Sequence, residues 1–185
     1  MTKIIASIVI LITVITMRVP GQVPLTYTEI IQVNSISKNE LYNRARLWFT
    51  TVYNSAKDVL QMDNKEEGQI IGKAIISYYP KVFVGSETTK GRINYTIKIF
   101  VKDGRYKYEI TDFVHHPDAS GSGPNSGNLG LITTDKEYPN AKSAHNWYNK
   151  VWSDIKNQIE HNILPLIVSL KEGMNKPAET KKDNW

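Results

Sequence analysis

The residue types best suited to catalysis cluster in one short segment, residues 115–118, which reads His-His-Pro-Asp. Imidazole and carboxylate groups are common zinc ligands and common general bases. Successive side chains of an extended strand point to opposite sides, so His115 and His116 cannot easily reach the same metal ion. The remaining histidines, His145 and His161, lack the spacing of a zinc motif. Our main interpretation therefore has no metal and no other cofactor. The alternative hypothesis is a metal-dependent enzyme with a site near His115, His116 and Asp118.

Residues 118–130 are rich in Gly, Ser, Asn and Pro, a composition that also occurs in serine-nucleophile turns and phosphate-binding loops. The triplet Gly121-Ser122-Gly123 lacks the strand-turn-helix context of a serine nucleophile, and no Gly-Lys-Ser/Thr follows to make a phosphate-binding loop. The chain has no cysteine, which excludes a thiol nucleophile, a thiolate metal site and disulfides together. The sequence therefore predicts a protein that is not an enzyme, with residues 118–130 forming a mobile loop.

The candidate binding residues are four basic side chains around one aromatic ring. They flank the dipeptide Asp103-Gly104 and are Lys98, Phe100, Lys102, Arg105 and Lys107. A basic patch with an aromatic centre is compatible with an anionic polymer or a glycan. Lysine on an outward strand face also blocks edge-to-edge aggregation, so the patch has a purely structural interpretation as well.

The positions of these residues follow from a predicted β-hairpin. Residues 92–102 and 105–114 flank Asp103-Gly104, a favoured two-residue type I′ turn. Pairing outward from the turn sets three apolar pairs on one face: Val101 with Tyr106, Ile99 with Tyr108, and Ile97 with Ile110. The other face receives Phe100 with Lys107, Lys98 with Glu109, and Thr96 with Thr111. A slip of one residue would expose the apolar set to water, so turn and alternation predict a single register.

Other segments supply the remaining elements. Residues 27–33 and 69–79 have the β-branched and alternating character of strands, and residues 129–133 predict a short final strand. Ser37 and Glu40 have the spacing of a capping box, which predicts a helix from there to near Asp63-Asn64. Its apolar stripe comprises Leu41, Ala45, Trp48, Phe49, Val52, Ala56 and Val59.

A second amphipathic helix is predicted to begin near Ser143, with Trp147 and Trp152 on its apolar stripe. Pro165 lacks an N–H group and predicts a kink or a break, and Gly173 predicts the end of the helix. The order of elements predicts one α+β domain in which two helices lie on one face of a twisted antiparallel sheet. The opposite face of that sheet is expected to stay largely uncovered.

The two ends of the chain differ from this domain. Lys3 precedes an apolar run over residues 4–17, which is typical of a signal peptide and too short for a membrane-spanning helix. We expect a signal peptide over residues 1–21, a single domain over 22–174 and a disordered tail over 175–185. The protein is then exported to the periplasm or the extracellular space, without a permanent membrane span.

The charge balance bears on the class of partner. The chain carries 23 basic and 18 acidic residues, a net charge of +5. Removal of residues 1–21 takes away Lys3 and Arg18, leaving 21 basic against 18 acidic residues and a charge of +3. So small an excess does not favour nucleic acid. The expected partner is an unknown protein or glycan of the cell envelope.

Several of these segments carry a family likeness. They are residues 37–45, Trp48-Phe49, residues 68–73, the hairpin residues 101–106, and Ser169-Leu170-Lys171 with Met174. Together they resemble a bacterial domain of unknown function described as having a TATA-binding-protein-like (TBP-like) fold. The resemblance implies a β-α-β-β-β-β-α order, a curved antiparallel sheet backed by two helices, and members that carry export signals. It implies no activity and no functional residues.

Overall fold

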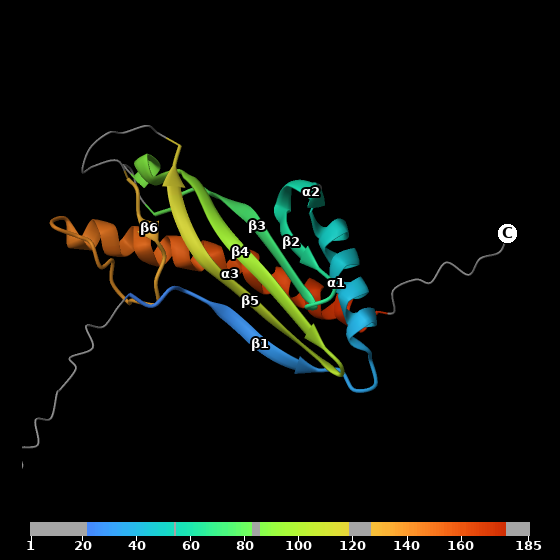
Figure 1. The fold of residues 1–185 in the computed structure, drawn as a ribbon. Helices are drawn as coiled ribbons and strands as arrows, with labels where there is room; N and C mark the ends of the chain where they lie inside the picture. The colour runs from blue at the N-terminus through green and yellow to red at the C-terminus, as the bar shows by residue number, and fades with distance from the viewer. Residues whose placement is uncertain (1–21, 54, 83–85, 119–126, 177–185) are drawn as a thin grey trace, which may run out of the picture.

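The computed structural model describes residues 22–53, 55–82, 86–118 and 127–176. The predicted signal segment, most of the predicted loop at 118–130 and nearly all of the predicted tail therefore lie outside the described residues. The elements, shown in Figure 1, are β1 (Tyr27–Gln32), α1 (Lys38–Val52), α2 (Ala56–Val59), β2 (Leu60–Asn64), β3 (Gln69–Tyr78), the short 3₁₀ helix η1 (Ser86–Thr89), β4 (Gly91–Lys102), β5 (Arg105–Pro117), β6 (Gly130–Leu131) and α3 (His145–Asn175).

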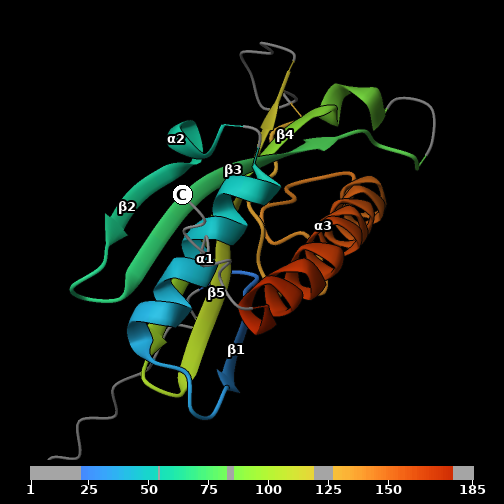
Figure 2. The same ribbon diagram turned by 90° about the vertical axis from the view of Figure 1, so that its right-hand side faces the viewer.

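The strands form one antiparallel sheet in the order β1-β5-β4-β3-β2. Strands β1 and β6 both pair with β5: β1 runs along residues 105–110, and β6 contacts Val114 and His115. Figure 2 shows α1 and α3 on the same side of the sheet. This confirms the predicted α+β arrangement with two helices on one face. The other side, called the open face below, is covered by neither α1 nor α3.

The hydrophobic core lies between the sheet and the two helices. Its largest fully buried side chains include Trp152, Tyr78, Tyr106, Phe49 and Phe113. Small residues on β3 allow α1 to approach, as their positions in the sequence suggest. A Cβ atom added at Gly72 would lie only 2.8 Å from Cε1 of Phe49, so this site requires glycine if the helix is to stay where it is.

The predicted hairpin is confirmed in its register. Val101 pairs with Tyr106, Ile99 with Tyr108 and Ile97 with Ile110 on the covered face, and Phe100 pairs with Lys107 on the open face. The turn is also attached to the rest of the domain. Gly104 N–H donates to the carbonyl of Ile36 at 2.9 Å, and the Asp103 carboxylate accepts from Lys38 N–H at 2.7 Å. The hairpin end of the open face is therefore held against the start of α1.

A β-bulge interrupts the hairpin further from the turn. Thr96 pairs with Thr111 while Asn94 pairs with Val114, so β5 has one residue more than β4 in this interval. The extra residue is Asp112, whose φ of 57° lies in the left-handed region. Before the bulge, the even-numbered residues of β5 face the core. The bulge shifts the alternation by one position, so after it the odd-numbered residues Phe113 and His115 face the core.

The first helix is shorter than its apolar stripe predicts. Helix α1 ends at Val52, and the chain from Leu60 to Asn64 forms strand β2 instead of more helix. The prediction of a helix to Asp63-Asn64 was wrong because β2 gains ladder hydrogen bonds along β3, a partner that helical periodicity does not reveal. The start is confirmed: the Ser37 hydroxyl accepts a hydrogen bond from Glu40 N–H.

The final helix continues past both the proline and the glycine, so the structure contradicts the predicted break at Pro165 and the predicted end at Gly173. Helix α3 runs without a break from His145 to Asn175, with Pro165 inside it. Gly173 does not end the helix; it packs against Trp48, whose Cδ1 would lie 3.0 Å from an added Cβ. Packing against the core on both sides of Pro165, through Ile163 and Ile167, holds the helix together there.

Arg44 contributes a second link between the two helices. Its Nη1 donates to the carbonyl of Met174 at 2.9 Å, and its Nε pairs with the Glu40 carboxylate at 2.8 Å. The sequence placed Arg44 away from the apolar stripe, yet the residue is buried because α3 ends over it. No helix in the described part of the chain is long and apolar enough to cross a membrane.

Candidate functional site

His115 is a structural residue of the core. It is fully buried, with Nε2 lying 2.8 Å from the Thr89 carbonyl oxygen and Nδ1 accepting from Leu129 N–H at 3.2 Å. A neutral ring with its proton on Nε2 satisfies both contacts. Burial lowers the pKa of this imidazole below its ordinary value. His115 thus joins Leu129, the residue just before β6, to Thr89 at the end of η1, and neither of its nitrogens is available to a metal.

His116 lies on the other side of the sheet, as strand alternation predicts. It pairs with Arg92 of β4 on the open face. Within the described residues, no group of three or more histidine and carboxylate side chains is arranged to hold a metal ion. The structure separates the two histidines, so the geometry offers no support for the alternative hypothesis of a metal-dependent enzyme at this position.

Four of the five candidate binding residues lie together. Near the turn, the open face has a shallow cavity of about 450 Å³, called the hairpin depression below. It spans three strands and is lined by Ile30, Phe100, Lys102, Arg105, Tyr106 and Lys107. The predicted positions of Phe100, Lys102, Arg105 and Lys107 therefore agree with a shared concave surface.

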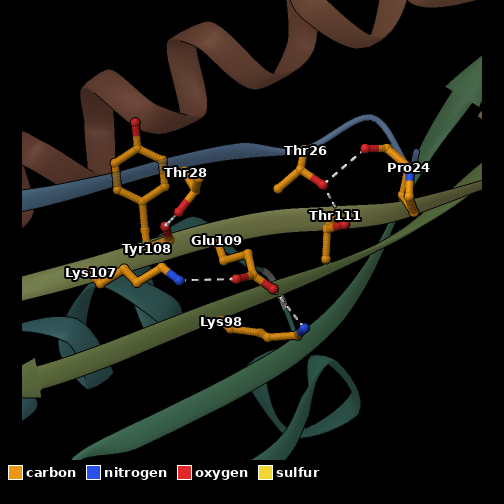
Figure 3. A network of polar contacts seen from close by, with 8 residues as sticks. All are labelled: Pro24, Thr26, Thr28, Lys98, Lys107, Tyr108, Glu109 and Thr111. Atoms are coloured by element: carbon orange, nitrogen blue, oxygen red, sulfur yellow. Dashed lines mark hydrogen bonds and ion pairs between the residues drawn. The ribbon is translucent and has the colours of Figure 1, made fainter. Parts of the chain in front are cut away.

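Lys98 is engaged elsewhere. Its Nζ pairs with the Glu109 carboxylate at 2.8 Å, and Lys107 reaches the same carboxylate at 3.2 Å, as Figure 3 shows. The hydrogen bond from Lys98, followed by that from Lys107, lowers the pKa of Glu109 below its ordinary value. Lys107 also lies 6.0 Å from the centre of the Phe100 ring. Glu109 thus partly neutralises one edge of the patch.

Ile30, which forms the apolar side of the hairpin depression, was not predicted from the sequence. Its side chain is 61% exposed. The pairing of β1 with β5 sets Ile30 opposite Lys107 and next to the basic residues. The β-branched and aromatic residues of 27–33 predicted a strand but not its neighbour, because the two strands lie more than 70 positions apart along the chain.

A second cavity on the open face was also missed. It has a volume of about 510 Å³ and surrounds the β-bulge, so it is called the bulge depression below. Its lining comes from α2, β3, β4 and β5 and consists of Asp58, Lys73, Ala74, Ile75, Asn94, Tyr95, Thr96, Asp112, Val114 and His116. The sequence signal that could have located it is the pair Thr111-Asp112, where a bulge ends the simple alternation.

The hairpin depression offers groups that can bind an anion. Three cations surround an apolar floor made by Ile30 and Phe100. Lysine and arginine can donate charge-assisted hydrogen bonds to a carboxylate, sulfate or phosphate, and the apolar floor can cover the carbon skeleton that bears it. The lining holds no carboxylate or imidazole that would act as a general base.

Two solved structures share the fold. A TBP-like protein from Parabacteroides distasonis is 16% identical and superimposes with a TM-score of 0.51, covering 84% of this chain and 95% of that chain. A DUF4468 family protein from Bacteroides ovatus is 12% identical with a TM-score of 0.55, covering 86% of this chain and 90% of that chain. At such low identity the likeness concerns the fold alone. No curated protein matches the chain.

The sequence profile of a family described as "Domain of unknown function (DUF4468) with TBP-like fold" matches residues 27–116. This range runs from the start of β1 almost to the end of β5 and includes the capped helix and the hairpin. It leaves out the resemblance noted at Ser169-Leu170-Lys171, which lies in α3. Residues 27–116 therefore match the DUF4468 family, a domain with a TBP-like fold to which no function is assigned.

Proposed function

We propose that this protein is an exported, non-enzymatic binding module whose open sheet face meets a protein or glycan partner of the cell envelope. The hairpin depression is the contact site in this proposal, and the group it binds is anionic. The observation that supports it most is the gathering of Lys102, Arg105 and Lys107 around exposed apolar surface, on a sheet face that neither α1 nor α3 covers.

The charges favour an anion over a neutral ligand at this place. Lys102 and Arg105 are exposed and have no ion-pair partner in the described part of the chain. Single exposed ion pairs contribute only about 0–1 kcal/mol, so several cations must act together. Contact with Ile30 and Phe100 adds apolar burial at about 25 cal/mol per Å². We expect an interaction that weakens as salt rises, because exposed charges are screened over about 8 Å at physiological ionic strength.

The proposal of export depends on the segment 1–21, and a contribution of the loop at 118–130 depends mainly on residues outside the described ranges. Both remain part of the proposal, but neither is needed for binding at the hairpin depression. The predicted absence of catalysis is likewise proposed from the missing base and nucleophile in the lining of that depression.

The test is a binding titration with two polyanions of different chemistry, poly-glutamate and heparin, measured by isothermal calorimetry at low and physiological salt. In the double variant Lys102→Gln/Arg105→Gln, we expect affinity for the bound polyanion to fall at least tenfold. The control is Lys136→Gln/Lys142→Gln, which removes the same charge from the exposed segment before α3. An equal loss in both double variants, or no binding of either polyanion by the unaltered protein, would contradict the proposal.

A further inference from the structure

One polar group that lines the bulge depression has no hydrogen-bond partner among the described residues. Asn94 lies on β4 beside the bulge, and its Oδ1 is buried with no hydrogen-bond donor among the described residues. An unsatisfied buried acceptor costs about 1–3 kcal/mol. A ligand that donates a hydrogen bond at this place would remove that cost.

The bulge also presents a carboxylate toward the same cavity. Asp112 is the extra residue of β5, it is exposed, and it adopts a φ of 57°. Left-handed backbone costs a residue with a Cβ atom about 1–2 kcal/mol, and aspartate tolerates it better than most. Such local strain is concentrated at functional sites, because the fold must compensate for it elsewhere.

The charged groups around the bulge depression are of mixed sign. Asp58 and Asp112 bring two carboxylates, and Lys73 brings one ammonium group. Asp58 already accepts a hydrogen bond from the Ser55 hydroxyl. By contrast, the side chains of Lys73, Asp112 and His116 form no hydrogen bond or ion pair with the residues that the structure describes.

This mixture selects against simple ions. An anionic ligand would lie close to two carboxylates, and a cationic ligand would lie close to Lys73. A hydroxyl group can both donate and accept, so several neighbouring hydroxyls could satisfy Asn94 Oδ1 and Asp112 while accepting from Lys73. Exposed Ile75 and partly exposed Val114 add apolar surface for the C–H groups of a ring.

We infer that the bulge depression is a second binding site, which takes a neutral, hydroxyl-rich ligand such as one ring of a saccharide. Its volume of about 510 Å³ falls within the range of about 300–1,000 Å³ usual for small-molecule sites. It shares no lining residue with the hairpin depression, although both lie on the open face. The inference therefore does not depend on the anion site proposed above.

The first step of the test applies the full chain to an array of immobilised neutral oligosaccharides. The tightest-binding oligosaccharide is then titrated by calorimetry against variants. Asp112→Gly removes the carboxylate and keeps a residue that accepts positive φ, so its folding should be unimpaired. We expect at least a tenfold loss of affinity in Asp112→Gly and in Lys73→Gln. The melting temperature of Asp112→Gly should equal or exceed that of the unaltered protein.

The control is the hairpin double variant Lys102→Gln/Arg105→Gln, whose affinity for the neutral oligosaccharide should change less than twofold. Absence of any retained neutral oligosaccharide overturns the inference. So does binding that survives both Asp112→Gly and Lys73→Gln. Loss of saccharide binding in the hairpin double variant alone would move the saccharide to the hairpin depression and overturn the second site, while leaving the anion titration to decide the proposed function.

Discussion

The two faces of the sheet use the same residue types in opposite ways. Phe113 and His115 lie on the covered face and are fully buried, whereas Phe100 and His116 lie on the open face. The buried ring of Phe113 stacks on Tyr95 at 5.7 Å, and the Phe100 ring is approached by a lysine. The difference shows that the side of the sheet, and not the residue type, determines whether a side chain stabilises the fold or remains available to a partner.

The largest expected effect comes from truncating Phe113, and truncation of Phe100 is the comparison. Phe113→Ala removes a fully buried ring that also meets Tyr27 edge-on at 6.0 Å, so we expect the free energy of unfolding to fall by about 3–5 kcal/mol. Phe100→Ala removes a partly exposed ring and should cost about 1 kcal/mol or less. Urea denaturation of both variants measures the two losses. Similar losses would mean that the open face is covered in solution.

An intermediate effect is expected from the two histidines. Burial lowers the pKa of His115 in the folded protein, while in the unfolded chain this pKa is about 6.5. The unfolded state therefore takes up the proton first as pH falls. The stability that neutral His115 contributes is complete above pH about 6.5, declines below it by at most about 1.4 kcal/mol per pH unit, and levels off below the folded-state pKa.

The measurement is urea denaturation of the unaltered protein and two variants between pH 7.5 and 5. His115→Gln should lose stability at pH 7.5 and have a flatter profile between pH 6.5 and 5 than the unaltered protein. His116→Gln, the matched change on the open face, should lose far less stability at pH 7.5 than His115→Gln. Identical profiles for all three proteins would refute a buried neutral His115.

The smallest effect is expected at Glu109, in the ion-pair group of the open face. Glu109→Gln breaks partly exposed pairs with Lys98 and Lys107, so thermal unfolding should show a loss below about 1 kcal/mol. The same change frees two cations beside the hairpin depression. Affinity for a bound polyanion should therefore increase, and a decrease would show that Glu109 orients Lys107 for binding.

Local patterns were sufficient for the hairpin register and the first helix cap, but not for the turn type: only Gly104 of the turn has a positive φ, so the turn is not the predicted type I′. The turn at Asp103-Gly104, the alternation on either side of it and the cap at Ser37 involve residues within a few positions of one another. For these elements the chain supplies its own partner, so the register and the face assigned to Phe100, Lys102, Arg105 and Lys107 were predictable. The open face was predictable as well, because both predicted helices were placed on one side of a single sheet.

Long-range pairing determined the rest. Strand β2 replaces the expected end of α1 because β3 offers it a ladder, and α3 continues past Pro165 because core contacts lie on both sides. Ile30 joins the hairpin depression only when β1 pairs with β5, and the bulge depression forms only where α2, β3, β4 and β5 meet. Periodicity records which side of an element is apolar. It does not record which distant element will cover that side, because this choice depends on the free energy of packing the whole chain.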